Sequence, residues 1–185
     1  MNEMQARLLA QGIVVLPEEI EHSTYEYVLE ALLERPNKQV VMYCKGDGGD
    51  SRSAMAMVDL IGLHGDVVGL LVGEANSSHA TIWASCQTRY VSAHGGIGLH
   101  KVAWSNFSGR ADSHNLKLVA QEFDTTEAKT AAILAKASNR DADWWLKTIQ
   151  ETGSSGIRQF DAARLIEMEM ARPIEARVME FLQAH

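Results

Sequence analysis

The sequence has few cysteines and no long apolar run, and each shortage excludes a class of protein. Cys44 and Cys86 are the two cysteines among 185 residues, which is too few for a disulfide framework and not a metal-binding spacing. No apolar stretch approaches the roughly 20 residues that a membrane span needs. We therefore expect a cytoplasmic protein with no disulfide, no metal, no cofactor and no membrane partner.

Positive charge is also scarce. The chain carries 17 Lys and Arg against 24 Asp and Glu, a formal net charge of −7. Because a nucleic-acid backbone is bound by a basic face, this balance argues against nucleic acid as a partner. Hydrophobic residues make up 46% of the chain, an ordinary share for a globular protein, and we expect residues 1–185 to form a single domain.

Short β-branched runs alternate with amphipathic segments along the chain. The runs typical of strands lie at residues 12–16, 40–44, 67–72, 90–92 and 97–100. Helical spacing of apolar residues occurs at 23–33, 51–63, 115–136, 143–149 and 161–170, and a glycine-serine stretch at 153–156 ends the fourth of these helices. Such alternation predicts a parallel sheet with covering helices, hence an α/β fold.

Two strand-to-helix turns carry residues that could do chemistry. Gly48 and Gly49 follow the second strand, and Ser77 and Ser78 follow the third. In parallel sheets, ligands bind at this end of the strands, where helix N-termini present free N–H groups. A serine there can act as a nucleophile, and nearby N–H groups can stabilise an oxyanion. Serine is also a common helix N-cap, and the local sequence alone favours that interpretation of Ser77.

Two histidines and the paired glycines each allow more than one interpretation. His100 ends the last strand-like run, from which it could accept the proton of a serine on a neighbouring strand. A hydrogen-bonded structural histidine is an equal alternative, since the chain has seven histidines. His79, two residues after Ser77, would point away from that serine on a helix and is interpreted as structural or as forming a wall of the site. The paired glycines match no nucleotide-binding spacing and could also form a simple tight turn.

Taken in order, these segments resemble the Clp protease proteolytic subunit family. The family's S-P-G-G turn is similar to Gly46-Asp47-Gly48-Gly49, and its G-x-A-A-S-M-G motif is similar to Gly73-Glu74-Ala75-Asn76-Ser77-Ser78-His79. Its strand ending in M-I-H-Q-P is similar to Gly98-Leu99-His100-Lys101-Val102. Asp112 and the long helical segment to Lys136 occupy the place of the family's handle.

The resemblance implies a serine endopeptidase with a ClpP/crotonase-like fold: a parallel sheet, covering helices and a protruding handle helix. It implies homo-oligomeric rings, heptamers stacked as a tetradecamer, that cleave peptides or unfolded proteins inside a chamber. It places the nucleophile at Ser77, the general base at His100, and the oxyanion-binding N–H groups at Gly48, Gly49 and Ser78. Peptide cleavage would then pass through an acyl-enzyme.

The third member of the triad depends on how the chain is aligned with the family. Aligning forward from residues 138–140 puts Thr148 at this position, and aligning backward from residues 161–163 puts Glu151 there. We prefer Glu151 because a carboxylate can stabilise the imidazolium and a threonine cannot. Asp143 is the reserve candidate.

Departures from the family keep other functions open. Only residues 1–6 precede Arg7, where the family has a segment that helps to engage an ATPase ring, so coupling to a Clp-type ATPase is doubtful and unassisted cleavage is favoured. A catalytically impaired ring subunit is the alternative if no acid supports His100. A crotonase-type acyl-CoA enzyme is a weaker one, with Glu74 as the carboxylate nearest to the nucleophile loop.

Overall fold

The fold is built on one mostly parallel sheet. The computed structural model describes residues 3–103, 112–153 and 156–176. Within these ranges seven strands form the main sheet in the order β1-β3-β5-β6-β9, with β7 beside β5 and β8 beside β7. The main-sheet strands are β1 (Ile13–Val15), β3 (Val40–Gly46), β5 (Val67–Asn76), β6 (Thr88–Val91), β7 (Gly96–Leu99), β8 (Arg158–Asp161) and β9 (Arg172–Pro173). The predicted α/β class is confirmed.

Strand β5 is longer than the sequence predicts, and its extension shapes the site. The strand was expected over residues 67–72, followed by a turn, but it continues to Asn76. Its first half pairs with β6, and Glu74–Asn76 pair with Gly96–Gly98 of β7, all in parallel. A register shift in β3 between Cys44 and Gly46 keeps that strand beside the extension. The nucleophile motif is therefore carried to the end of a central strand.

Each of the five predicted helical segments has a helix at or near its position. The helices are α1 (Glu3–Ala10), α2 (His22–Leu33), α3 (Ser51–His64), α4 (Ser78–Ser85), α5 (Ser113–Lys136), α6 (Ala142–Gln150) and α7 (Ala162–Glu167), with a 3-10 turn at Ile174–Ala176. Asp50 caps the start of α3 by accepting hydrogen bonds from the N–H groups of Arg52 and Ser53. Gly65 ends α3 in the left-handed conformation, φ 81°.

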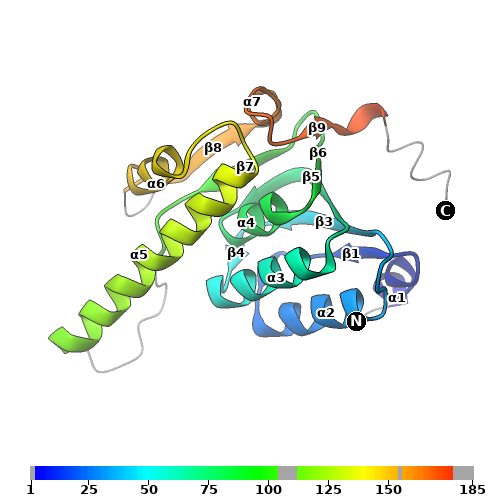
Figure 1. Ribbon diagram of the computed structural model, residues 1–185, viewed down its shortest axis with the longest axis horizontal. Coiled ribbons are helices and arrows are strands. Elements are labelled where there is room, and N and C mark those ends of the chain that lie inside the picture. Colours follow the sequence, from blue (N-terminus) through cyan, green and yellow to red (C-terminus); the bar gives the residue numbers. More distant parts are fainter. Residues whose placement is uncertain (1–2, 104–111, 154–155, 177–185) are drawn as a thin grey trace.

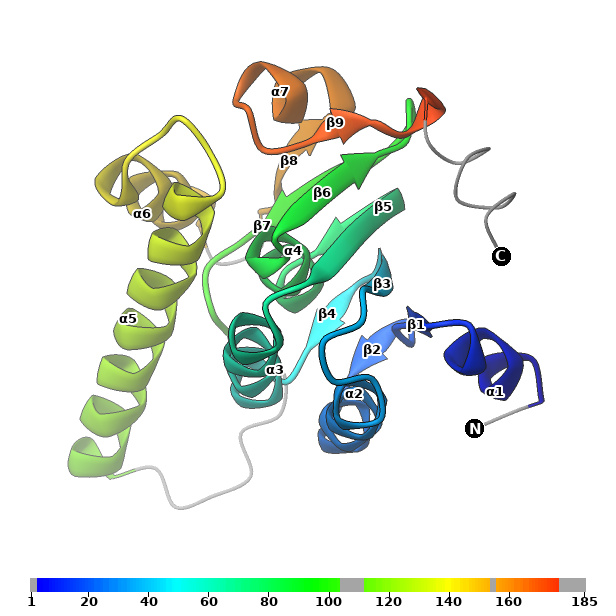
Figure 2. The same ribbon diagram turned by 45° about the vertical axis from the view of Figure 1, so that its right-hand side comes forward.

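Helices α2, α3 and α4 lie along the sheet, whereas α5 projects away from it (Figures 1 and 2). The buried residues of α5, which are Glu127, Ala131 and Leu134, all belong to its second half, where it packs against α6 and α4. In its first half Leu116 and Leu118 are half exposed. The protruding handle helix implied by the resemblance is thus present.

The structure also contains short strands that the sequence does not predict. Two two-residue strands, β2 (Glu19–Ile20) and β4 (Gly48–Gly49), pair in parallel next to the nucleophile turn. Strand β8 pairs antiparallel with β7, and its Phe160 is buried. The last predicted helix, over 161–170, is shorter and spans Ala162–Glu167, because Asp161 belongs to β8 and the helix ends at its C-cap, Met168. The glycine-serine break at 153–156 includes residues 154 and 155, which lie outside the described residues.

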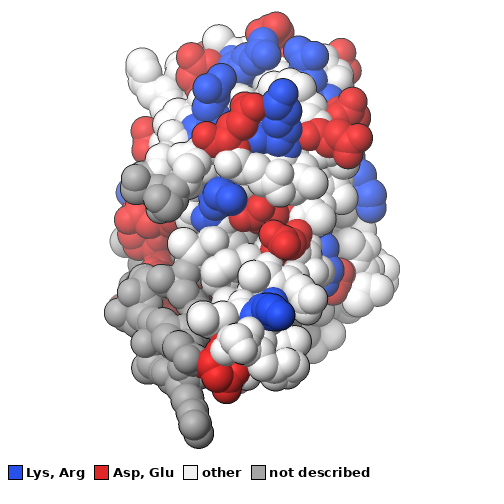
Figure 3. All heavy atoms as spheres, turned by 90° about the vertical axis from the view of Figure 1, so that its left-hand side faces the viewer, with Lys and Arg blue, Asp and Glu red and all other residues white. Residues whose placement is uncertain are grey.

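Charge on the α5 side of the molecule is mixed. In Figure 3 the acidic and basic side chains interleave toward the upper end of this face, rather than gathering into a field of one sign. No helix in the described part of the chain is both long and apolar enough to cross a membrane.

Candidate active site

The turn between β5 and α4 holds Ser77 in a conformation that residues other than glycine rarely adopt. Ser77 has φ 53° and ψ −117°. Its N–H donates to the Gly98 carbonyl on β7 at 2.7 Å, and its carbonyl accepts from the N–H and the hydroxyl of Thr81 at 3.2 and 3.3 Å. Backbone strain of this kind costs about 1–3 kcal/mol and persists where surrounding contacts fix it, most often at functional sites.

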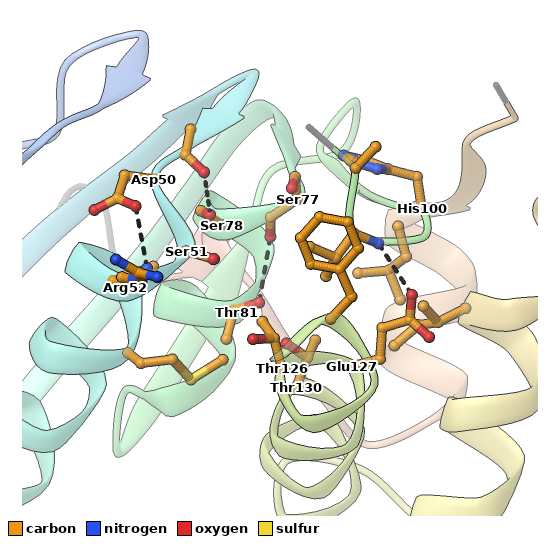
Figure 4. Close-up of a pocket in the computed structure, with 18 of the residues that line it drawn as sticks. Asp50, Ser51, Arg52, Ser77, Ser78, Thr81, His100, Thr126, Glu127 and Thr130 are labelled. Atoms are coloured by element: carbon orange, nitrogen blue, oxygen red, sulfur yellow. Dashed lines mark hydrogen bonds between the residues drawn. The ribbon is translucent and has the colours of Figure 1, made fainter. Parts of the chain in front are cut away.

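The Ser77 side chain does not cap the helix that follows it. Among the described residues, its hydroxyl accepts no hydrogen bond from the first turn of α4. Ser77 instead lines a pocket, together with Ser78 and His100 (Figure 4). The geometry therefore favours the nucleophile interpretation over the N-cap interpretation that the local sequence favours.

Two glycines bring a second turn against Ser77. Gly48 has φ 115°, and a Cβ atom on it would lie 2.6 Å from the Cβ atom of Ser77. Gly49 has φ 128°, and a Cβ atom there would lie 2.3 Å from the carbonyl oxygen of Ile20 on β2. Both positions therefore require glycine for conformation and for space. This close approach places backbone groups of the turn next to Ser77.

His79 supports this turn from the interior. Its side chain is fully buried, its Nδ1 accepts the Gly48 N–H at 3.1 Å, and its Nε2 donates to the Pro17 carbonyl at 2.9 Å. These two bonds require the neutral ring with its proton on Nε2. Burial lowers the pKa of His79, which favours the same neutral form. The structure therefore supports a structural role for His79, because its two hydrogen bonds connect the glycine turn to Pro17.

The Gly48 N–H is one of the groups expected to bind an oxyanion, but it already donates a hydrogen bond to His79. Gly48 is also not among the residues that line the pocket. Gly49 and Ser78 do line it, and the Ser78 hydroxyl donates to the Gly49 carbonyl at 3.0 Å. Ser78 is the first residue of α4, where backbone N–H groups have no partner within the helix.

His100 directly follows β7 and faces the same pocket. Its Nδ1 lies 2.6 Å from the carbonyl oxygen of Lys101, so Nδ1 carries the proton and Nε2 is the acceptor. No hydrogen bond joins Ser77 and His100 in the described structure, and catalytic hydrogen bonds often form only when substrate binds. The structure therefore brings both expected residues to one pocket with the tautomer that a general base needs.

None of the three acid candidates proposed from the sequence reaches this pocket. Glu151 is the C-cap of α6, its side chain is 66% exposed, and its carboxylate lies 3.7 Å from the Lys147 ammonium. Thr148 donates its hydroxyl to the Trp144 carbonyl, and Asp143 is exposed. Helix α6 turns Trp145 and Ile149 toward the interior, and this rotation leaves the acidic positions of α6 on the solvent side. In this structure Glu151 therefore lies outside the pocket that Ser77 and His100 line.

A carboxylate that the sequence reasoning passed over does line the pocket. Glu127, on α5, is 3% exposed, and the pocket of about 450 Å³ that it helps to line also contains Ser77 and His100. A signal for it was available in the sequence, because Glu127, Ala131 and Leu134 are spaced as one buried helical stripe. A carboxylate inside such a stripe is rare unless it has a partner.

The carboxylate considered for acyl-CoA chemistry lies outside this pocket. Within the described ranges, no three His, Cys, Asp or Glu side chains gather so that they could hold a metal ion. Glu74, the carboxylate considered for acyl-CoA chemistry, is exposed and does not belong to the pocket lining.

Comparisons with known proteins give the family. A model of the Clp protease family matches residues 1–152, a range that includes Ser77, His100 and Glu127. The chain belongs to the Clp protease family. One curated relative, the ATP-dependent Clp protease proteolytic subunit of Leuconostoc citreum (strain KM20), is 24% identical over 148 residues, which are 76% of this chain and 74% of that protein. Membership of this family implies a serine peptidase, and the mostly parallel sheet with covering helices is consistent with the family's fold.

Proposed function

We propose that the chain is a serine endopeptidase that cleaves peptides or unfolded polypeptides, with Ser77 as nucleophile and His100 as general base. The observation that carries this proposal is the strained backbone of Ser77, whose hydroxyl faces the pocket instead of capping α4. Strain is expected at an activated nucleophile and has no use in an ordinary N-cap.

The proposed reaction proceeds in two steps. His100 Nε2 takes the proton of the Ser77 hydroxyl while the serine oxygen attacks the substrate carbonyl carbon. The N–H groups of Gly49 and Ser78 stabilise the negative charge that develops on the carbonyl oxygen. The imidazolium then protonates the leaving amine, and a water molecule activated by His100 releases the acyl group from Ser77.

Assembly and location are part of the same proposal. The half-exposed Leu116 and Leu118 on the projecting half of α5 suit a contact between subunits, and we propose homo-oligomeric rings, heptamers stacked in pairs. Cys44 and Cys86 are buried free thiols, which fits a cytoplasmic protein. Light scattering tests the assembly, because a monomer or dimer at every concentration contradicts the rings.

A fluorophosphonate probe and a fluorogenic peptide test the chemistry, with no ATPase present. The expected result is one adduct per subunit on Ser77 and peptide hydrolysis, both lost in Ser77→Ala. Ser85→Ala is a matched control, because Ser85 also belongs to α4 but its hydroxyl is used in a hydrogen bond to the Ile82 carbonyl. A folded, oligomeric wild type that gives neither adduct nor hydrolysis favours the impaired ring subunit instead.

A further inference from the structure

Glu127 is a buried carboxylate with only half of its hydrogen-bonding capacity used. Its Oε1 accepts the Val102 N–H at 3.1 Å, while its Oε2 is buried without a hydrogen-bond partner among the described residues. Leaving a charged group in this state is costly, because burial removes the water that would otherwise solvate it. A neutral acceptor, such as an amide oxygen, would be enough to accept the Val102 N–H. The hydrogen bond to Val102 alone therefore does not explain why a carboxylate is buried here.

The other charged side chains that line the pocket either have a partner for their charge or are exposed to solvent. Glu122 pairs with Arg52, with 2.7 Å between Oε1 and the guanidinium, and Asp50 caps α3. Glu19 and Asp47 are exposed. Glu127 is therefore the one buried carboxylate in the part of the chain that the structure describes.

The contact with Val102 brings Glu127 close to the general base. His100 precedes Val102 by two residues, so their Cα atoms are at most about 7 Å apart. The intervening Lys101 N–H donates to the Thr152 hydroxyl at 3.1 Å, which fixes the segment from the α6 side while Glu127 fixes it from α5. Figure 4 shows Glu127 reaching from α5 toward the segment that carries His100.

We propose that Glu127 is a positioning residue that supplies the negative charge supporting the His100 imidazolium. The inference rests on the proposed peptidase function. In a triad, one acid both orients the imidazole and stabilises its positive charge; here two different groups would carry out these two functions. The Lys101 carbonyl orients the ring and sets its tautomer, and Glu127 provides the charge. When Nε2 takes the Ser77 proton, the ring becomes positive, and the role of Glu127 is electrostatic, with no proton moving to the carboxylate.

Glu127→Gln tests this inference because glutamine keeps the shape and the acceptor for the Val102 N–H but removes the charge. We expect kcat/KM to fall about 10- to 100-fold. The negative charge favours protonated His100, so without it we expect the acidic limb of the kcat/KM profile to move to lower pH. The other charges on or beside the pocket, which are Glu19, Asp47, Asp50, Arg52, Lys101 and Glu122, are common to both proteins and cancel in the comparison.

Two controls separate charge from structure. Glu151→Gln removes an exposed carboxylate on α6 and should leave both the rate and the pH profile unchanged. Glu127→Asp keeps the charge, so its acidic limb should stay near that of the wild type even if its rate falls. Circular dichroism melting identifies any variant that does not fold.

Hydrogen–deuterium exchange at the His100 imidazole, followed by mass spectrometry, reports the titration of this one histidine even without turnover. A lower titration midpoint in Glu127→Gln supports the inference. A folded Glu127→Gln protein with a wild-type pH profile and an unchanged His100 midpoint overturns it. A different outcome separates the two proposals. If the wild-type Ser77 is not labelled by the probe but the His100 midpoint still depends on Glu127, the peptidase proposal is contradicted. The inference that Glu127 acts on His100 is then still supported.

Discussion

Ser77 and His100 face one pocket, but the backbone around the serine is fixed by buried contacts, whereas the backbone around the histidine is fixed by partly exposed ones. Ser77 contacts β7, α4 and the glycine turn, and His79 behind that turn is fully buried. His100 and Val102 are partly exposed, Lys101 is exposed, and their contacts come from α5 and α6. The half of the site around Ser77, the proposed nucleophile, is thus built into the sheet. The half around His100, the proposed base, depends on how two helices pack beside it; these are called the nucleophile half and the base half.

The largest effect is expected from adding a methyl group next to Ser77, in the nucleophile half. Gly48→Ala places a Cβ atom 2.6 Å from the Cβ atom of Ser77, at a φ of 115° that alanine rarely adopts. We expect a loss of about 2–4 kcal/mol in the free energy of unfolding and at least a 100-fold loss of Ser77 labelling rate. Thermal melting and the fluorophosphonate labelling rate measure the two effects.

Gly65→Ala is the matched control for this change. Gly65 also has positive φ, 81°, but a Cβ atom there would meet no atom within 4 Å. Its cost should be about 1 kcal/mol, from conformation alone, with normal labelling. If both variants lose the same stability and keep the same labelling rate, close packing of Gly48 against Ser77 is not what fixes the nucleophile.

A smaller and pH-dependent effect is expected from His79. Because burial lowers the pKa of His79 in the folded protein, the unfolded chain binds a proton more readily, and stability falls as pH drops below about 6.5. Protonation would also put a second N–H opposite the Gly48 N–H, breaking that hydrogen bond. We expect His79→Gln to be less stable than the wild type at pH 7.5, and to lose less stability than the wild type between pH 7.5 and 5.5.

Melting temperatures of the two proteins at both pH values check this expectation. His22→Gln is the control, because His22 is an exposed residue at the start of α2 and its removal should leave the pH dependence as it is. An identical pH dependence in His79→Gln and the wild type would show that the buried ring does not control the turn.

The sequence predicts the nucleophile half of the site better than the base half, for a physical reason. Ser77, Gly49 and Ser78 belong to two local strand-to-helix turns whose chemistry can be read from neighbouring residues. The backbone segment that follows His100 is held by Glu127 and Thr152, which lie 27 and 52 positions after His100 in the chain. Contacts of that kind depend on the packing of α5 and α6, which local patterns do not specify.

The same distinction bears on the triad acid, which the sequence alone does not fix. Alignment from either side of α6 gave Thr148 or Glu151, because both alignments assumed that the acid lies on that helix. The rotation of α6 is set by Trp145 and Ile149, which are buried, and it leaves Glu151 in solvent. The short strand β8 was missed in a similar way, since its pairing with β7 joins segments about 60 residues apart.

The smallest expected effect lies at the rim of the pocket, where α3 and α5 meet. Arg52 on α3 and Glu122 on α5 form an ion pair at 2.7 Å, and their side chains are 76% and 43% exposed. Exposed pairs contribute little and are screened by salt. We expect Arg52→Gln to lower the melting temperature by less than about 2 °C, and the difference to disappear in 1 M salt. A large, salt-independent loss would mean that this contact helps to set how α5 sits beside α3, and that the base half is held more firmly than its exposure indicates.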